Sequence, residues 1–407
     1  MGAHKMKKNN RITPEGTRDY LFEECRVRRQ IEGKLSDVFC SHCFREVVTP
    51  GLEFYDVYDP ELSGIPPEAM FKMTDRRGRL MVMRPDNTLS IARLTATRLQ
   101  NLPKPIRLYY NQPVYRNHPG LTGRNNENAQ MGVELLGAEG IRPDLETITI
   151  AVESLSQCIQ NFRLELGHAG FFRELADRLE IAEDVREDIR EAIESKNYTS
   201  LSDLLGGMRD CAETRALREL PRLFGGEEVF EKAAPFCTGR LKETLDYLHG
   251  IYRSLSGFGL GNRLIVDLGL VQRNDYYTGV IFSAYAEECG DAVLLGGRYD
   301  HLLEHFGEPL PAIGFAVDVN AIANILCGHS KNHMKEQPSD VLVFGEDGYE
   351  MKALRYMAKL ISDGVRCENS IAQTKSEALE YARKNGIARV DIVGASEESI
   401  STERSSL

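Results

Sequence analysis

Three segments of the chain carry side chains of the kinds that hold charged and polar ligands. The first is Arg84-Pro85-Asp86-Asn87-Thr88, the second runs from Arg116 to Glu134, and the third is Asp275-Tyr276-Tyr277. Carboxylates, amides, guanidinium groups and tyrosines bind such ligands by hydrogen bonds. Gln130 and Glu134 stand four residues apart, so on a strand they share one face. That face could line a pocket or simply meet water, and the spacing fits both interpretations.

The signatures of several common enzyme classes are absent from the sequence. It contains no G-x-x-x-x-G-K-[ST], no G-x-S-x-G and no H-E-x-x-H. Gly257-Phe258-Gly259-Leu260-Gly261 precedes an expected strand, whereas a dinucleotide-binding loop must follow one, so we predict a turn. Cys40-Ser41-His42-Cys43 has zinc-ligand spacing but lacks a second pair of cysteines. We therefore predict buried thiols on a helix and no metal site.

The elements that must position these side chains can be read from hydrophobic periodicity. Residues 106–115 and 130–136 predict an antiparallel hairpin whose long polar loop, 117–129, is a natural place for function. Apolar residues at helical spacing predict a long amphipathic helix over about 17–44. The remaining expected elements are strands at 47–50, 80–83, 263–270 and 280–284, helices at 89–99, throughout about 145–256 and up to about 326, and a helix opening at Gly296–Asp300.

The same pattern predicts how the chain divides into domains. We expect a flexible N-terminus over 1–11, a large domain over 12–327 with a helical insertion at about 165–255, and a linker over 328–339. Strands and helices alternate from 340 to 393, before a Ser/Glu-rich end, so 340–407 predicts a small α/β domain.

Composition limits the class of protein. The chain has 407 residues, 42% of them hydrophobic and 27% charged, and no stretch apolar enough for a membrane helix. Its net charge of -11 argues against broad binding of nucleic acid or anionic membranes. Nine scattered cysteines and the lack of a signal peptide predict reduced thiols in the cytoplasm.

Considered together, the segments resemble one family. Residues 84–88, the hairpin from Val114 to Glu134, and Asp275–Gly279 followed by Gly297–Asp300 and Ala312–Ala316 are similar to the motifs of histidyl-tRNA synthetases. The resemblance covers about residues 12–325 and implies an α+β fold of the class II aminoacyl-tRNA synthetase type. That fold is a mixed, mainly antiparallel sheet flanked by helices, usually dimeric through the first long helix and the strand ending at Pro50.

The resemblance also implies a pocket for L-histidine. A histidine site should supply carboxylates, an amide or guanidinium group, and aromatic walls. By similarity to the family, Asp86 and Thr88 face the ligand's ammonium group, and Arg116 and Gln130 face its carboxylate. Glu134 and Tyr277 hold the imidazole, while Tyr276 and Tyr299 line the pocket.

Departures from the family pattern lie on the nucleotide side. Where the resemblance implies the catalytic arginine and the ATP-binding arginine, this chain has Gln272 and Ala321. Losing one donor oriented at developing charge typically costs about 10²- to 10³-fold in rate. We therefore expect no amino-acid activation, no catalytic residue and no cofactor.

The C-terminal segment resembles a truncated anticodon-binding domain. From Glu336 to Leu407 it carries 9 basic and 13 acidic side chains, which is the wrong balance for neutralising phosphates. We therefore expect no binding of tRNA and no binding to a membrane.

A synthetase-like chain with an amino-acid pocket but without its ATP arginines resembles the regulatory subunits of ATP phosphoribosyltransferase. That resemblance implies a partner, the short-form catalytic subunit, in the first step of histidine biosynthesis, within a hetero-octamer containing dimers of this chain. It also implies feedback inhibition by histidine, bound either in this pocket or on the partner. Two alternatives stay open: a divergent, active histidyl-tRNA synthetase, and a stand-alone histidine-binding or translation-control module.

Overall fold

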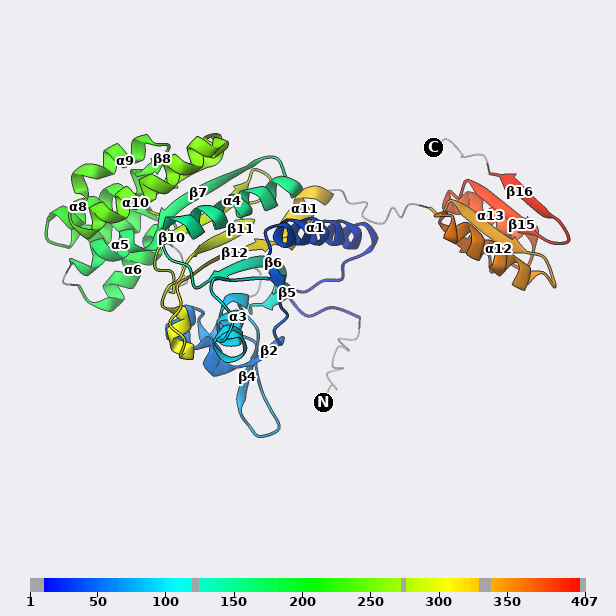
Figure 1. The fold of residues 1–407 in the computed structure, drawn as a ribbon, viewed down its shortest axis with the longest axis horizontal. Helices are drawn as coiled ribbons and strands as arrows, with labels where there is room; N and C mark the ends of the chain where they lie inside the picture. The colour runs from blue at the N-terminus through cyan, green and yellow to red at the C-terminus, as the bar shows by residue number, and fades with distance from the viewer. Residues whose placement is uncertain (1–10, 119–123, 180, 272–275, 329–337, 403–407) are drawn as a thin grey trace, which may run out of the picture. The chain divides into compact units, whose positions relative to one another are not determined.

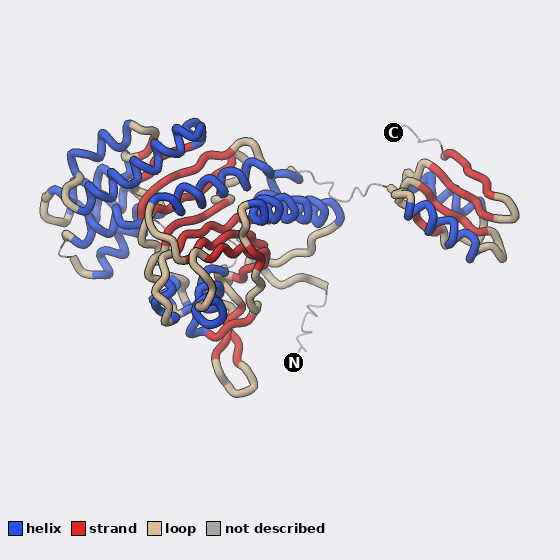
Figure 2. The backbone as a smooth tube through the Cα atoms, viewed as in Figure 1, coloured by secondary structure: helices blue, strands red, loops and turns tan. Residues whose placement is uncertain are grey.

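The chain forms two units, residues 1–333 and residues 334–407. The computed structural model describes residues 11–118, 124–179, 181–271, 276–328 and 338–402. Figure 1 traces the elements of both units, and Figure 2 separates helices from strands. Each unit has its own buried apolar clusters, so each is described by itself.

A nine-stranded mixed sheet forms the centre of the first unit. Its strand order is β1-β5-β6-β12-β11-β10-β7-β9-β8, and all neighbours are antiparallel except β1 with β5 and β7 with β9. The strands are β1 (Arg45–Glu46), β5 (Ile106–Tyr115), β6 (Glu127–Leu136), β7 (Phe162–His168), β8 (Phe224–Gly225), β9 (Leu264–Asp267), β10 (Val280–Ala286), β11 (Leu294–Arg298) and β12 (Ala312–Asp318). The expected class II synthetase architecture, a mainly antiparallel sheet with flanking helices, is confirmed.

One face of this sheet is covered by three helices, α1 (Phe22–Ser41), α4 (Ile141–Cys158) and α11 (Val319–Cys327) (Figure 1). Successive side chains of a strand point to opposite faces. Met131, Val133 and Leu135 of β6 are therefore buried in one cluster with the apolar side of α1. The alternate residues, Gln130 and Glu134, face the other side. This alternation decides which β6 side chains can reach a ligand.

The other face carries a second apolar cluster, formed with smaller elements. These are the three-stranded sheet β2-β4-β3, the helix α3 and several helical turns. Their bounds are β2 (Leu52–Phe54), β3 (Lys72–Thr74), β4 (Leu80–Met83), α2 (Pro60–Ser63), α3 (Asn87–Leu94), η1 (Tyr55–Tyr58), η2 (Pro67–Ala69), η3 (Thr95–Leu99) and η8 (Leu302–Phe306).

Helices between β7 and β9 form the insertion seen in green in Figure 1. The insertion is connected to the sheet by hydrogen bonds among three side chains, Asp144 of α4, Arg298 of β11 and Tyr247 of α10. Arg298 Nε donates to Asp144 Oδ1 at 2.8 Å, and the Tyr247 hydroxyl donates to Asp144 Oδ2 at 2.7 Å. The insertion contains α5 (Ala169–Asp177), α6 (Glu183–Glu194), α7 (Tyr198–Gly206), α8 (Ala212–Glu219), α9 (Glu228–Ala233), α10 (Arg240–Leu255), η4 (Leu220–Arg222), η5 (Ala234–Phe236), η6 (Ser256–Leu260) and η7 (Gly261–Arg263).

Four local predictions were wrong. The chain is not helical throughout 145–256, because β7 is a strand between β10 and β9 in the main sheet. Gly296–Asp300 does not open a helix, since Gly296–Arg298 end β11. Residues 47–50 lie after β1 instead of forming a strand. The thiols of Cys40 and Cys43 are exposed, not buried.

The second unit is a four-stranded sheet with two helices. Its order is β14-β13-β15-β16, from β13 (Val341–Gly345), β14 (Cys367–Asn369), β15 (Arg389–Val393) and β16 (Glu397–Ser401), with α12 (Glu350–Ser362) and α13 (Lys375–Asn385). Part of the Ser/Glu-rich end, for which no strand was predicted, pairs with β15 as β16. Within the described ranges, neither unit has a helix long and apolar enough to cross a membrane.

Candidate functional site

A cavity of about 100 Å³ opens on the sheet face opposite α1, α4 and α11. The structure brings all eight predicted ligand-contacting residues to its lining: Asp86, Thr88, Arg116, Gln130, Glu134, Tyr276, Tyr277 and Tyr299. They come from the start of α3, the β5–β6 hairpin, the segment before β10 and the end of β11. Four separate parts of the sequence therefore supply one site.

Glu134 is the buried carboxylate at the base of the cavity, with 1% of its surface exposed. The Thr88 hydroxyl donates to its Oε1 at 2.9 Å, and the Tyr299 hydroxyl donates to its Oε2. Burial, reinforced by the charge of Asp86, raises the pKa of Glu134 to about 8 against the two hydrogen bonds. The side chain is therefore poised to give up a proton when a cation binds beside it.

Gly314 of β12 makes room for this carboxylate. A Cβ atom at that position would overlap the Glu134 carboxylate and the carbonyl oxygen of Val133. Gly314 is the direct partner of Glu134 across the β6–β12 pair, so the two residues lie opposite each other on the same face. Any side chain at 314 would displace Glu134.

Asp86 supplies a second carboxylate at the start of α3. Its Oδ1 accepts from the Leu89 backbone N–H at 3.1 Å, so it caps the helix, and its carbonyl oxygen accepts from the Tyr58 hydroxyl at 2.6 Å. Desolvation raises the pKa of Asp86, while the nearby Arg116 opposes the shift. Arg116 is oriented by donating from Nε to the Pro85 carbonyl oxygen at 3.0 Å. The cavity therefore has a fixed anion beside a fixed cation.

Gln130 is held by α3 as well. Its Oε1 accepts from Asn87 Nδ2 at 3.3 Å, and Asn87 Oδ1 accepts from Gln112 Nε2 at 2.9 Å. This chain of amides fixes the side chain at the cavity wall. Asn87, directly after the helix-capping Asp86, connects β6 to α3.

Three tyrosines form the aromatic wall. The Tyr276 ring lies 4.8 Å from the Tyr277 ring and 5.8 Å from the Tyr299 ring, measured between centroids. All three side chains are buried, and desolvation raises the pKa of Tyr276 and Tyr299 well above the ordinary value. Arg173 of α5 donates to the Tyr277 carbonyl oxygen at 3.1 Å, so the insertion supports this wall.

Sequence reasoning missed two polar side chains that also line the cavity, Tyr110 and Asp318. Tyr110 lies on β5, next to the glycine at position 132, where an added Cβ would contact its ring. Asp318 is paired with Gln130 across the β6–β12 ladder. Both positions follow from strand register, which the sequence pattern did not specify.

Of the two predicted arginine replacements, the structure describes one. Gln272 and Asp275 lie outside the described residues. Ala321 is in the first turn of α11, and its backbone N–H donates to Asp318 Oδ1 at 2.9 Å. It is not among the described residues that line the cavity.

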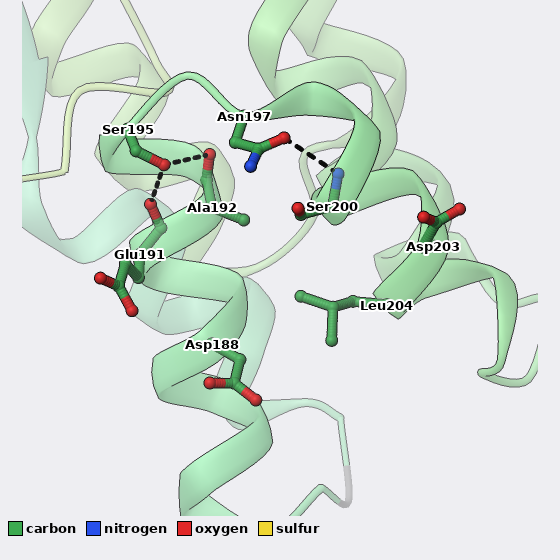
Figure 3. Close-up of a pocket in the computed structure, with 8 residues that line it drawn as sticks. All are labelled: Asp188, Glu191, Ala192, Ser195, Asn197, Ser200, Asp203 and Leu204. Carbon is green, nitrogen blue, oxygen red and sulfur yellow. Dashed lines mark hydrogen bonds between the residues drawn. The ribbon is translucent and has the colours of Figure 1, made fainter.

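A larger hollow of about 620 Å³ lies elsewhere, between α6 and α7 (Figure 3). Its described lining consists of small, polar and acidic side chains with one leucine, and includes no aromatic or cationic group. Several of its polar groups serve the helices themselves. Ser195 Oγ donates to the Glu191 carbonyl oxygen at 2.7 Å, and Asn197 caps α7 through the Ser200 N–H at 3.1 Å. The smaller cavity therefore has the chemistry suited to a specific ligand.

Replacing Glu134 with glutamine is expected to flatten the pH dependence of folding stability. Between its ordinary pKa of 4.5 and its folded pKa of about 8, Glu134 keeps a proton that the unfolded chain has released. The free energy of unfolding of the natural chain therefore loses a contribution as pH rises through that window. Urea unfolding at about pH 5, 6.5 and 8 gives the free energy of unfolding of both proteins. The value for the glutamine variant should rise relative to that of the natural chain as pH rises. Parallel pH profiles would contradict the assignment.

Comparison with known proteins shows which family the chain resembles in sequence and in fold. Residues 16–322 match the histidyl-tRNA synthetase family. An ATP phosphoribosyltransferase regulatory subunit from Clostridium botulinum is 38% identical over 94% of this chain and 92% of its own. The subunit of the same name from Bacillus cereus is 37% identical over 97% of this chain and 94% of its own.

A solved structure from Bacillus halodurans, described as an ATP phosphoribosyltransferase regulatory subunit/histidyl-tRNA synthetase, gives a TM-score of 0.83 at 26% identity. That match covers 96% of this chain and all of the solved one. The fold, the extent of the sequence match and the names of the relatives agree. The chain belongs to the family of ATP phosphoribosyltransferase regulatory subunits, built on the histidyl-tRNA synthetase fold.

Proposed function

We propose that this regulatory subunit catalyses no reaction itself and is required by a separate, short-form ATP phosphoribosyltransferase for full activity in the first step of histidine biosynthesis. The relatives that the chain matches over nearly their whole length are named regulatory subunits. The observation that carries the rest of the proposal is the cavity around Glu134, whose charged and aromatic lining suits free L-histidine.

In this proposal the ligand's three polar parts meet three parts of the lining. Asp86 and Thr88 serve the ammonium group, and Arg116 with Gln130 serves the carboxylate. Glu134 and Tyr277 hold the imidazole, between the rings of Tyr276 and Tyr299. The support is that these groups share one small cavity and that Glu134 is desolvated, which strengthens a hydrogen bond to a cationic partner.

The lack of catalysis is attributed to Gln272 and Ala321, which replace the arginines that the family resemblance implies. Without those cations, charge developing on a transferred phosphate has no oriented partner. The net negative charge of the C-terminal unit supports the further proposal that the protein does not bind tRNA.

Regulation by histidine needs unequal binding to two states. If histidine binds the inhibited state of the complex more tightly than the active state, then by linkage the partner's substrates must in turn alter the affinity for histidine. We place the histidine in the cavity around Glu134. Binding of the feedback histidine to the partner subunit instead is an outcome that the calorimetry described in the Discussion separates.

Assembly is part of the proposal as well. We propose dimers of this chain within a cytoplasmic hetero-octamer containing four catalytic subunits. Three exposed apolar side chains lie close in sequence to Pro50, where the strand that the resemblance assigns to dimer formation ends: Val48 follows β1, and Leu52 and Phe54 belong to β2. Free thiols at all nine cysteines are compatible with a reducing compartment.

Adding the purified chain to a short-form ATP phosphoribosyltransferase is expected to raise its turnover severalfold. The same preparation should show no histidine-dependent exchange of pyrophosphate into ATP, because the ATP-binding arginines are replaced. A bona fide histidyl-tRNA synthetase serves as the positive control for exchange. Robust exchange would instead support an active synthetase, and absence of both stimulation and exchange would support a stand-alone histidine-binding module.

A further inference from the structure

Asp318 places a third carboxylate in the cavity, on the side that the proposed binding mode gives to the ligand's carboxyl group. It is the cross-strand partner of Gln130, and directly paired side chains of an antiparallel ladder lie roughly 5 Å apart at Cβ. Both residues line the cavity. An anionic group bound beside Gln130 would therefore lie close to the Asp318 carboxylate.

A helix cap fixes the position of the Asp318 side chain. Its Oδ1 accepts from the Ala321 backbone N–H at 2.9 Å, so it caps α11. Burial raises the pKa of Asp318, whereas the hydrogen bonds from the Ala321 and Asn320 N–H groups favour the ionised form. The cap also occupies the N–H group at the start of α11, which could otherwise bind an external anion.

The charges around the cavity are unequal. Among its described lining residues, Arg116 is the cation, and Asp86, Glu134 and Asp318 are the carboxylic acids. Arg116 lies near Asp86, whose pKa it influences. The pKa of Asp318 is influenced instead by a further acid, Asp291, which raises it, and by the cation Arg28 of α1, which lowers it. On the carboxyl side of the cavity, the Asp318 carboxylate therefore opposes part of the attraction that Arg116 offers to a negative charge.

We propose that Asp318 is a specificity-determining residue that disfavours anionic groups on the carboxyl side of the cavity, so that the site also accepts imidazole amines whose carboxyl group is replaced by a neutral one. The ligand class includes the amide and the primary alcohol corresponding to histidine. Phosphate-bearing extensions of the amino acid are excluded by the same charge. This inference rests on the proposed binding of histidine in the cavity.

The test compares two ligands of nearly equal shape, L-histidine and L-histidinamide, by isothermal titration calorimetry at neutral pH. The variant is Asp318→Asn, because asparagine also caps helices and preserves side-chain size. The control is Asp188→Asn, which removes the same charge from the hollow between α6 and α7. Thermal melting monitored by circular dichroism checks that both variants are folded.

We expect Asp318→Asn to tighten histidine binding about tenfold, because repulsion between like charges is removed in a partly dehydrated site. Histidinamide binding should change less than about threefold, since its amide is neutral. Asp188→Asn should alter neither. Equal changes for both ligands, or none, with histidine still bound, would overturn the role of Asp318 alone. If neither ligand binds the natural chain or the variants, the proposed histidine site fails together with this inference.

Discussion

Replacing Glu134 with alanine is expected to weaken L-histidine binding by roughly 100-fold or more. Removing one partner of a buried, charge-assisted hydrogen bond typically costs about 2–5 kcal/mol, because the other partner stays buried without it. The hydroxyl groups of Thr88 and Tyr299 would also lose their acceptor. Isothermal titration calorimetry on the isolated chain measures the effect directly.

Two further variants separate charge from shape and from position. Glu134→Gln keeps the size of the side chain but cannot become anionic, so we expect a loss smaller than that of alanine. Glu127→Ala changes an exposed glutamate on the same strand and should leave the affinity unaltered. A folded alanine variant with normal affinity would move the histidine site to another part of this chain, whereas no binding of histidine to the isolated natural chain would favour a site on the catalytic partner.

The variant Arg298→Leu is expected to lower the free energy of unfolding by about 3–5 kcal/mol, because it leaves the Asp144 carboxylate buried without its cation. The Arg298 side chain is 7% exposed and that of Asp144 is 0% exposed. Arg298 also donates to Asp300 at 2.9 Å and to the Ala138 carbonyl oxygen at 3.1 Å. Urea unfolding followed by circular dichroism gives the change in stability.

The matched control is Lys242→Ala on α10. Its ion pair with Asp246 is 2.7 Å long, but both side chains are 61% exposed, so we expect a loss below about 1 kcal/mol. The double variant Arg298→Leu, Asp144→Leu should recover much of the stability, because an apolar pair often replaces a buried ion pair without loss. A double variant as unstable as the single one would show that Arg298 acts mainly through its other hydrogen bonds.

The hairpin that carries the site was predictable from the sequence. Strand β5 has the expected bounds, Ile106–Tyr115, and it pairs antiparallel with β6. The alternation of apolar and polar residues on β6 also separates core-facing from cavity-facing side chains. The eight candidate site residues came from the family resemblance, because no spacing rule connects Asp86 to Tyr276 across nearly half of the chain.

Strands β7 and β11 were missed for different reasons. Phe162, Leu164 and Leu166 alternate as buried strand residues, but the helical sequence on both sides masked a strand of seven residues. The segment Gly296–Asp300, which contains the end of β11, was predicted to open a helix. The real role of its glycines is close packing, because a Cβ at Gly297 would lie 2.7 Å from the Tyr277 ring. Such a contact involves residues far apart in the sequence and becomes visible only once the sheet is formed.

Strand β16 shows the limit of composition as a guide. Glu397–Ser401 is polar and mostly exposed, as expected for an edge strand, and its pairing with Val390 and Ile392 of β15 decides its structure. Asp318 was missed for a related reason, since its place beside Gln130 depends on the register of β12 against β6.

The close approach of Gly314 to Glu134 has a consequence for how the family can diverge. Substitutions at the tyrosine wall can be accommodated by new ring packing, but any side chain at position 314 must displace the Glu134 carboxylate. Relatives that no longer bind the ligand can therefore lose this glycine, whereas relatives that still bind the ligand cannot. The residue at this one position should thus serve as a marker, in newly sequenced relatives, of whether the pocket is still under selection.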